Sequence, residues 1–380
     1  MTKPVPYRIC TNCVMDTSDP RIVFDDNGIC DHCIDFKTNI QPRWHPDEQS
    51  RRQLETIVQS IKRAGKGNDF DCLLGLSGGM DSSYMLHVMV TEFGLRPLVF
   101  HVDGGWNSEL SVHNINVLID KLGLDLYTEV INWDEMRDFQ LAWFKSGVPH
   151  IDIPQDHAFV ATLYDFADKY RIGYILNGGN ISTEVVRYPI EYYYYGTDML
   201  QIRDIMKHYS TIRMDTYPFS SIYRHKIYLR YVRKVKVVKP LNLLPYTKAA
   251  AAELLETQYG WKLYPQKHFE SRFTRFFEGY WLPERFGFDP RRVQFSSLIL
   301  TGQMSREQAL RELEKPSYDP ETIAHDFTYV ATKLGISDDE LRSYFEMPKK
   351  YYWDYRNQQS ILSLGRKTLT AFGLDRGGVR

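Results

Sequence analysis

The feature that most constrains the fold is the stretch LLGLSGGMDSS at residues 73–83, where an apolar, strand-like run ends in a Ser-Gly-Gly turn and a helix start. Two glycines let backbone N–H groups converge on an anion, and the N-terminus of the following helix adds partial positive charge. The loop lacks the lysine of a G-x-x-x-x-G-K-[ST] motif. It carries Asp81 instead, which repels phosphate unless it binds Mg²⁺ that also grips the phosphate. The stretch therefore predicts a pyrophosphate-holding loop, with a plain glycine turn and N-cap as the structural alternative.

Strand-like and helical patterns alternate around this loop. The expected strands are 70–76, 96–105, 125–133 and 172–180, and the expected helices are 82–93, 108–122, 134–145 and 156–170. Such alternation predicts an α/β fold with a parallel, doubly wound sheet covered on both faces. Ligands bind beyond the carboxyl ends of the strands in these sheets. Three of those ends are distinctive, namely SGGMDSS, HVDGGW and NGGN.

The rest of the chain divides into flanking regions. A charged helix at 46–65 leads into the sheet, a further strand with its exit is expected at 234–245, and a strong helix former at 247–260 ends in glycine. The tyrosine-dense segment 187–198 reads as a loop or irregular helix. Beyond 261 the chain is mostly helical, with two capping-box patterns, Ser305 with Gln308 and Ser337 with Glu340. We therefore expect three regions, 1–45, 46–260 and 261–380.

Four of the five cysteines share one motif. The spacing C-x2-C-x16-C-x2-C of Cys10, Cys13, Cys30 and Cys33 is that of a zinc site, and an Asn-Gly turn between the two halves predicts a hairpin. Two disulfides are the alternative, which a reducing cytosol disfavours. Four thiolates leave no open position, so the zinc is expected to be structural and His32 a bystander. Cys72 lies in an apolar run and is expected to be a small core residue.

Composition limits the partners. The net charge is −1 and the isoelectric point about 6.8, without the basic excess of most nucleic-acid-binding proteins. The N-terminus lacks the apolar segment of a signal peptide, and no apolar run reaches the length of a membrane span. We expect a cytoplasmic protein with neither nucleic acid nor membrane as partner.

The stretch SGGMDSS after a strand resembles the S-G-G-x-D-S signature of the PP-loop ATP pyrophosphatases, whose fold is adenine nucleotide alpha hydrolase-like. The resemblance implies cleavage of ATP between the α and β phosphates. In these enzymes a carbonyl oxygen attacks the α-phosphorus, and a nitrogen or sulfur nucleophile then displaces AMP from the adenylated intermediate.

Three further stretches resemble the N-acetyl sugar amidotransferases of the WbpG/PseA/LegA group. They are ICTNCVMDTSDPRIVFDDNGICDHC near the N-terminus, NGGNISTE at 177–184 and KHFESRFTRFFEGYWLPERFGFD at 267–289. The similarity spans roughly residues 7–345. It implies conversion of a sugar acetamido group to an acetamidino group, for a lipopolysaccharide O-antigen or for a nonulosonic acid such as pseudaminic or legionaminic acid, with ATP, Mg²⁺ and Zn²⁺ as cofactors. The acceptor would be a nucleotide-linked or free acetamido sugar.

The resemblance also implies nucleotide-binding residues. Pyrophosphate would be cradled by Ser77, Gly78, Gly79, Ser82 and Ser83, and Asp81 would hold Mg²⁺. Adenosine would lie at the second strand end, formed by His101, Val102 and Asp103. The same cleft would be faced by Gly178, Gly179 and Asn180.

Catalytic and substrate roles follow in the same way. The expected catalytic residues are Asp81, Lys267, His268 and Arg275, with Arg272 as a further cation on ATP. Surface solvation or salt bridging is the alternative for the three cations Lys267, Arg272 and Arg275. His268 would shuttle a proton. The substrate contacts are expected from Glu184, Arg187, Tyr192, Tyr193, Tyr194 and Tyr195.

Ammonia must come from another protein if Cys72 is buried, because glutamine hydrolysis commonly uses a cysteine nucleophile. The resemblance implies a HisH-like glutaminase, with a HisF-like subunit as a possible ammonia channel. Two other functions compete with this one. A PP-loop tRNA thiolase would also carry a zinc module but needs further cysteines, and a nucleotide-binding scaffold would not need the intact S-G-G-x-D-S motif.

Overall fold

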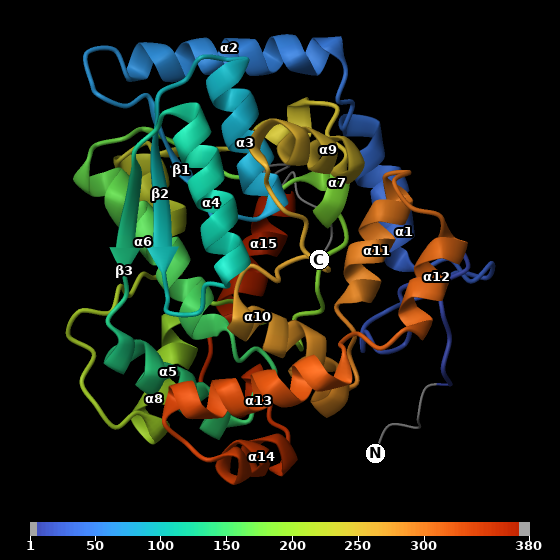
Figure 1. The fold of residues 1–380 in the computed structure, drawn as a ribbon. Helices are drawn as coiled ribbons and strands as arrows, with labels where there is room; N and C mark the ends of the chain where they lie inside the picture. The colour runs from blue at the N-terminus through green and yellow to red at the C-terminus, as the bar shows by residue number, and fades with distance from the viewer. Residues whose placement is uncertain (1–5, 372–380) are drawn as a thin grey trace.

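The computed structural model describes residues 6–371 and has one five-stranded parallel sheet at its centre (Figure 1). The strand order is β3-β2-β1-β4-β5, and the strands are β1 (Cys72–Gly75), β2 (Pro97–Asp103), β3 (Leu126–Val130), β4 (Tyr174–Leu176) and β5 (Lys236–Val238). All four pairings are parallel. The predicted α/β class is confirmed. The order reverses between β1 and β4, the switch point at which open parallel sheets bind ligands.

The sheet is covered on both faces, as the strand sequences require. Cys72 and Leu74 point into one core and Leu73 into another, because side chains alternate along a strand. The first face is covered by α2 (Glu48–Ala64), α3 (Met80–Thr91), α4 (Glu109–Leu122) and α9 (Lys248–Tyr259). The second face is covered by α5 (Trp133–Ser146), α6 (Ile153–Lys169) and α8 (Met199–Tyr209). Figure 1 shows α2 lying across the end of the sheet where the strands begin.

All five strands are shorter than the sequence predicts, and the last two differ most. The expected strand 172–180 is reduced to β4, so that NGGN is a loop and not part of the ladder. The expected strand 234–245 is β5 followed by the 3-10 helix η4 (Pro240–Leu243). Pro240 has no N–H to donate, which ends the pairing of an edge strand at this point. Both shortenings free the carboxyl ends of β4 and β5 for a site.

The segment between β4 and β5 is largely irregular, as predicted for 187–198. It contains α7 (Ile181–Glu184), α8 and the π-helix η3 (Arg224–Val232).

The C-terminal region is helical, as predicted. Its elements are α10 (Arg272–Phe276), η5 (Phe277–Phe286), α11 (Arg291–Leu300), α12 (Arg306–Glu314), α13 (Pro320–Leu334), α14 (Asp338–Glu346), η6 (Tyr352–Asp354) and α15 (Gln359–Ala371). Ser305 forms both bonds of the predicted capping box with Gln308. Ser337 caps α14 by accepting the N–H of Glu340.

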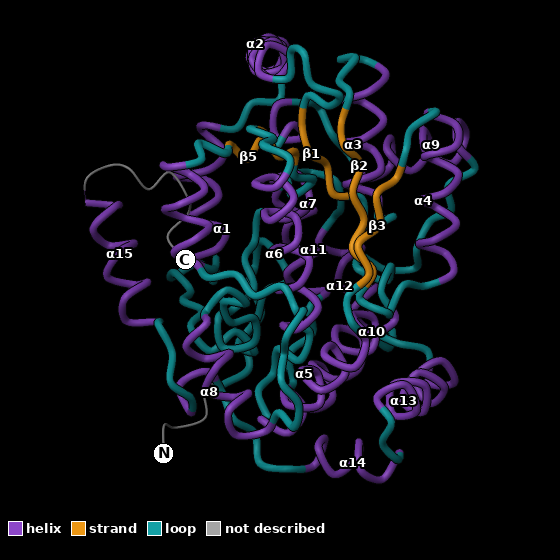
Figure 2. The backbone as a smooth tube through the Cα atoms, turned by 90° about the vertical axis from the view of Figure 1, so that its left-hand side faces the viewer, coloured by secondary structure: helices purple, strands orange, loops and turns teal. Residues whose placement is uncertain are grey.

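The N-terminal module consists of α1 (Asp31–Asp35), η1 (Phe36–Ile40), η2 (Gln41–Arg43) and the loops before them. The predicted hairpin is reduced to a single antiparallel bridge between Phe24 and Cys30, with Gly28 at φ +80° in its turn. This module and the C-terminal helices share a third hydrophobic core, which includes Met15 and Phe288. The module contacts α11 through its cysteine loop, where Val14 N donates to Ser296 Oγ at 3.2 Å. Figure 1 shows the module beside α11 and α12, and Figure 2 shows α2 end-on above the strands.

Within residues 6–371, no helix combines the length and the apolar character needed to cross a bilayer.

Candidate functional site

A cavity of about 510 Å³ opens at the carboxyl ends of β1 and β4. The β1–α3 loop contributes Ser77, Gly79, Asp81 and Ser82 to its wall, and the β4 loop contributes Gly178 and Gly179. These two loops touch, because a Cβ on Gly178 would lie 3.2 Å from the backbone nitrogen of Ser82. The structure therefore joins two of the three strand ends that the sequence singled out. The opposite wall comes from the start of α9 and from residues 261–270.

The β1–α3 loop requires glycine at position 78. Gly78 has φ +81°, and a Cβ there would lie 2.8 Å from the carbonyl oxygen of Ser111 in α4. Its own carbonyl accepts hydrogen bonds from Trp261 Nε1 (3.2 Å) and Tyr264 Oη (3.1 Å). Gly79 is the N-cap of α3 and provides no side-chain cap, so the first turn of the helix keeps free N–H donors.

The loop serines separate into two groups. Ser77 and Ser82 line the cavity, and their hydroxyl oxygens lie 3.2 Å apart. Ser83 is fully buried, and its Oγ has no partner among the described residues. Ser77 and Ser82 are thus placed to contact a ligand, whereas Ser83 faces the protein interior.

Lys267 connects the loop to the C-terminal part of the chain. Its Nζ lies 3.1 Å from Asp81 Oδ2 and 2.7 Å from Glu184 Oε1, and it donates to Thr183 Oγ1 at 3.2 Å. Tyr246 donates its hydroxyl to the other oxygen of Asp81. Three predicted site residues, Asp81, Glu184 and Lys267, therefore meet in one cavity.

The opposite charges of Lys267 and of the two carboxylates, Asp81 and Glu184, stabilise one another. Burial alone would raise the pKa of Asp81, but Lys267 and the Tyr246 hydroxyl lower it below its ordinary value. Burial alone would lower the pKa of Lys267, but Asp81 and Glu184 raise it above its ordinary value. Both groups are consequently charged at neutral pH.

Lys248 is a second cation on the cavity wall that the sequence analysis did not select. It is the first residue of α9, after the exit of β5. Burial and the neighbouring Lys267 lower its pKa. Its local sequence, a helix start just after a strand exit, does not by itself mark it as a site residue.

His268 and Glu270 also line the cavity. His268 is a non-glycine residue with φ +66°, and its Nδ1 lies 2.9 Å from Glu278 Oε1. Glu270 lies against the loop, since a Cβ on Gly79 would clash with its Oε1. Burial raises the pKa of Glu270. Glu270 and Glu278 stand in the stretch 267–289 that carried the resemblance, but neither was selected.

The side chains at the strand end expected to hold adenosine make hydrogen bonds and packing contacts within the protein. His101 Nδ1 donates to Leu76 O (2.8 Å), and its Nε2 accepts from Asn107 Nδ2 (2.9 Å). Val102 is buried in the second-face core. Asp103 accepts the N–H of Gly105 at 2.7 Å. Asn107 bridges to Ser271 in antiparallel fashion, so residues near 271 lie beside this strand end. None of the three predicted residues lines the cavity described above.

Asn180 has a structural task in this conformation. It is buried, it caps α7 by accepting the N–H of Thr183 at 2.9 Å, and its Nδ2 donates to Gly178 O at 3.1 Å. Asn180 therefore shapes the β4 loop.

The two predicted arginines lie outside the cavity wall and bind one buried carboxylate. Asp326 is 1% exposed in its side chain. It accepts from Arg272 Nη2 (2.9 Å), Arg275 Nε (2.8 Å) and Arg275 Nη2 (2.7 Å), and from the hydroxyl of Tyr318. Arg272 also stacks on the ring of Tyr329 at 3.5 Å. Their catalytic and ATP-binding roles stay predictions, and the structure gives both a structural partner.

The tyrosine run does not line the cavity either. Tyr192 donates to Ser18 O at 3.1 Å, Tyr193 donates to Glu278 at 3.0 Å, and Tyr194 donates to Asp198 at 2.6 Å. Tyr195 packs on Tyr194 with ring centres 5.3 Å apart. Arg187 is exposed on the segment just before them. Tyr193 is connected to the cavity through Glu278 and His268.

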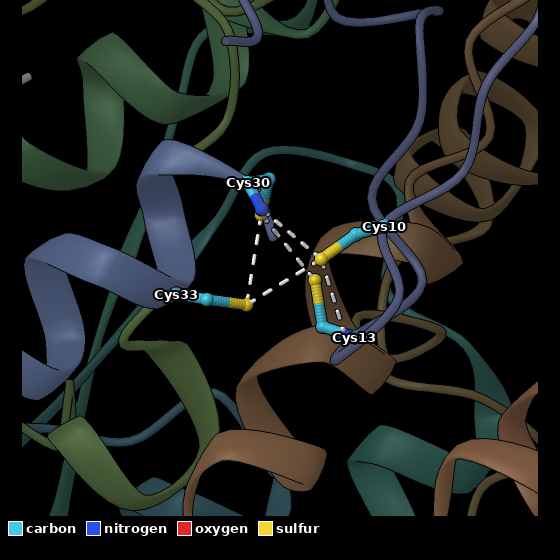
Figure 3. A group of neighbouring side chains, drawn as sticks. All are labelled: Cys10, Cys13, Cys30 and Cys33. Atoms are coloured by element: carbon cyan, nitrogen blue, oxygen red, sulfur yellow. Dashed lines mark hydrogen bonds between the residues drawn. The ribbon is translucent and has the colours of Figure 1, made fainter. Parts of the chain in front are cut away.

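The four motif cysteines converge on one point (Figure 3). Their sulfurs all lie within 4.8 Å of one another, with separations of 3.6 Å for Cys13–Cys30 and Cys30–Cys33 and 3.8 Å for Cys10–Cys33. A tetrahedral site with metal–sulfur bonds of about 2.3 Å places its sulfurs roughly 3.8 Å apart. All four are free thiols, so the disulfide alternative is not what the structure shows. The cluster can hold a metal ion.

Two C-terminal arginines hold the cysteine loop in place. Arg306 donates to the carbonyl oxygens of Cys10 and Cys13 at 2.9–3.1 Å. Arg292 pairs with Asp16 at 3.0 Å and donates to Val14 O at 2.9 Å. Cys72, by contrast, is buried in the sheet core, and burial raises the pKa of its thiol.

Comparison with known proteins gives a family match for the C-terminal part of the chain. Residues 270–369 match the family model of the LPS biosynthesis protein WbpG-like, C-terminal domain. The chain carries a WbpG-like C-terminal domain. This confirms the resemblance to the WbpG group and assigns α10 to α15 to that domain. The match begins three residues after Lys267.

The chain also has more distant similarities to other proteins. It is 26% identical over 107 residues to an uncharacterised protein of Methanocaldococcus jannaschii, which is 28% of this chain and 36% of that protein. The chain thus spans about a third of that relative's length. Among solved structures, it is similar to the NH3-dependent NAD synthetase of Campylobacter jejuni, with 16% identity, 79% of this chain and 98% of that chain covered, and a TM-score of 0.29. The NMN synthetase of Francisella tularensis gives 16% identity, 60% and 100% coverage, and a TM-score of 0.29. The fold assignment rests on the strand order and not on these scores.

Proposed function

We propose that the WbpG-like chain is an ATP-dependent amidotransferase that converts the acetamido group of a sugar into an acetamidino group and releases AMP and pyrophosphate. The observation that supports this most is the Asp81–Lys267 pair at 3.1 Å. It brings the loop predicted to hold pyrophosphate into contact with Lys267, which lies three residues before the start of the WbpG-like match. The product would belong to a lipopolysaccharide O-antigen or a nonulosonic acid.

The cavity offers donors for a leaving pyrophosphate. The free N–H groups at the start of α3, the hydroxyls of Ser77 and Ser82, and the cations Lys248 and Lys267 all face one space. Donors fixed before the reaction stabilise developing negative charge without reorganisation. Asp81 would hold Mg²⁺, since Mg²⁺ commonly binds through one or two carboxylates together with substrate phosphates. The metal would neutralise charge on the phosphates.

An acetamide is a poor electrophile toward ammonia because its oxygen is a poor leaving group. In the first step the acetamido oxygen bonds to the α-phosphorus of ATP, and the bond from that phosphorus to the bridging oxygen breaks to release pyrophosphate. In the second step ammonia adds to the carbon of the resulting O-adenyl imidate. The carbon–oxygen bond then breaks, AMP leaves with the former acetamido oxygen, and the ammonia nitrogen remains as the amidine. The protein's part is positioning and charge stabilisation.

The cysteine cluster would hold structural Zn²⁺ that fastens the N-terminal module to α11 and α12. Ammonia would come from a separate HisH-like glutaminase, possibly through a HisF-like subunit. The burial of Cys72 supports this division, because no other cysteine lies outside the cluster.

Isotope transfer tests the proposal. The purified protein is incubated with ATP, Mg²⁺, ammonium and diacetamido sugars, free or UDP- or CMP-linked, that carry ¹⁸O in the acetyl carbonyl. We expect sugar-dependent pyrophosphate release, a product in which NH replaces one oxygen, and one ¹⁸O atom in AMP. An Asp81→Asn variant should lose all three signals.

Two outcomes would overturn the proposal. Label remaining in the sugar while ATP is consumed would exclude attack by the acetamido oxygen. Pyrophosphate release with tRNA and a sulfur donor, but with no sugar, would identify a thiolase. Useful glutamine hydrolysis by the isolated chain would contradict only the separate glutaminase.

A further inference from the structure

Glu278 lies directly behind His268, outside the residues that the proposed reaction uses. Its side chain is 6% exposed. Oε1 accepts from Tyr193 Oη at 3.0 Å and lies 2.9 Å from His268 Nδ1, and Oε2 accepts from Gln294 Nε2 at 3.3 Å. Glu278 belongs to η5 in the WbpG-like domain, whereas His268 lines the cavity. The carboxylate is thus a buried anion whose nearest titratable partner is a cavity residue.

His268 is held in one orientation. Its φ of +66° is uncommon for a non-glycine residue, and its Nδ1 is committed to Glu278. Nε2 has no hydrogen-bond partner within the described part of the chain and is the ring nitrogen left for a ligand. Burial alone would lower the pKa of His268, but the charge of Glu278 and the hydrogen bond to it raise it to about 9.

We propose that Glu278 is a positioning residue that keeps His268 doubly protonated, so that Nε2–H donates to an anion in the cavity. This differs from the proton shuttle expected from the sequence. A permanently charged imidazole at neutral pH is a donor, not a general base. Identification of the anion as pyrophosphate rests on the proposed function, but the charge state of His268 does not.

Other charged groups near His268 shift its pKa in opposite directions. Lys267 next to it disfavours the protonated ring, while Glu270 on the cavity wall favours it. Asp152 is 2% exposed, and burial, Asp156 and Glu278 raise its pKa well above the ordinary value, which reduces the negative charge that it contributes near the ring. Glu278 is the main anion acting on His268.

Histidine titration by NMR tests the proposal directly. The chain has 11 histidines, and His268→Asn, a residue that tolerates positive φ, identifies the His268 resonance. We expect a titration near pH 9 in the wild type. In Glu278→Gln, which keeps an acceptor oxygen but loses the charge, the midpoint should fall by about 1–3 pH units. Tyr193→Phe is the matched control, because it removes a hydrogen bond from the same oxygen and keeps the charge, and its midpoint should stay near that of the wild type.

Binding of inorganic pyrophosphate, measured by calorimetry at pH 8 and pH 5.5, tests the consequence. Loss of a charge-assisted donor should weaken binding to Glu278→Gln by about 10-fold at pH 8. Binding should recover to the wild-type value at pH 5.5, where the ring is protonated again. A purely structural defect would persist at both pH values.

Each unfavourable outcome contradicts a specific part of the proposal. A wild-type His268 that titrates at or below pH 6.5 overturns the proposal even if no Glu278 variant folds. A shifted midpoint with unchanged pyrophosphate binding at pH 8 overturns the donor role. Failure of every sugar to react would refute the proposed function and leave the titration intact.

Discussion

The ammonium nitrogen of Lys267 lies 3.1 Å from Oδ2 of Asp81, although 186 positions separate the two residues. The lysine that the loop lacks is therefore supplied from a distant segment. Lys267 is 12% and Asp81 19% exposed in their side chains, so the pair is only weakly screened by solvent. A phosphate group that bound to the loop would lie near a cation whose position is already fixed.

We expect Lys267→Met to lower kcat/KM for sugar-dependent pyrophosphate release by about 10²- to 10³-fold, the usual effect of removing one donor to developing charge. Methionine keeps the apolar stem of the side chain. Lys315→Met is the matched control, since Lys315 pairs with Glu312 at 2.7 Å on an exposed surface of α12. Equal rates for the two variants would contradict a role for Lys267.

A double-mutant cycle separates coupling from independent effects. Residues in direct contact usually show interaction energies of about 0.5–3 kcal/mol. The losses from Asp81→Asn and Lys267→Met in pyrophosphate binding should therefore not add in the double variant. Strict additivity, measured by calorimetry, would mean that the 3.1 Å contact does not influence the ligand.

The glycine at position 78 yields a prediction with an internal control. Gly78→Ala and Gly67→Ala both place a side chain at positive φ (+81° and +86°), which costs about 1–2 kcal/mol. A Cβ at Gly67 meets nothing within 4 Å, whereas one at Gly78 meets Ser111 O at 2.8 Å. Urea unfolding should show the larger loss for Gly78→Ala, and only that variant should lose pyrophosphate binding. A larger loss for Gly67→Ala would argue against the loop geometry.

The sheet was predictable because its signals are local. Strand–helix alternation and the glycine turn at Gly78 depend on neighbouring residues, so the order of elements followed from the pattern. The four cysteines of the zinc-site motif can likewise be recognised from their spacing. Strand lengths were less predictable, because Pro240 ends β5 only in the context of an edge strand.

The far wall of the cavity could not be predicted in this way. Lys248 and Glu270 carry no spacing signal and reach the loop only through tertiary packing. The partner of the arginines was equally hidden from local pattern. Arg275 stands in a stretch rich in cations, and Asp326, the residue that it binds, is 51 positions away.

Asp326 is expected to be a determinant of stability. Removing one partner of a buried ion pair costs about 3–5 kcal/mol, and Asp326→Asn would leave Arg272 and Arg275 without their shared carboxylate. Urea unfolding at pH 7 measures the loss. Arg342→Ala is a suitable control. Arg342 of α14 stacks on Phe327, which lies next to Asp326 in α13, and its own partner is this ring and not the carboxylate.

The same carboxylate predicts a pH dependence. Burial would raise the pKa of Asp326, but hydrogen bonds from Tyr318 and Arg272 and the charge of Arg275 lower it overall. A carboxyl whose folded pKa is depressed stabilises the protein above its unfolded pKa of about 3.9 and loses that effect as the pH falls through the folded value. The stability gap between wild type and Asp326→Asn should therefore be constant from pH 7 to about pH 5 and narrow below pH 4. A gap that widened with acid would refute the assignment.

Metal removal tests the N-terminal cluster. If Cys10, Cys13, Cys30 and Cys33 hold one Zn²⁺, the purified protein should contain one equivalent, and a chelator should lower the melting temperature because structural zinc contributes folding free energy. Cys13→Ser should bind less metal, whereas Cys72→Ser should keep a full equivalent, since Cys72 lies in the sheet core. Arg306 donates to the loop carbonyls of Cys10 and Cys13, so Arg306→Ala should retain the metal but release it faster to the chelator. Metal content unchanged by Cys13→Ser, or reduced by Cys72→Ser, would place the ion elsewhere.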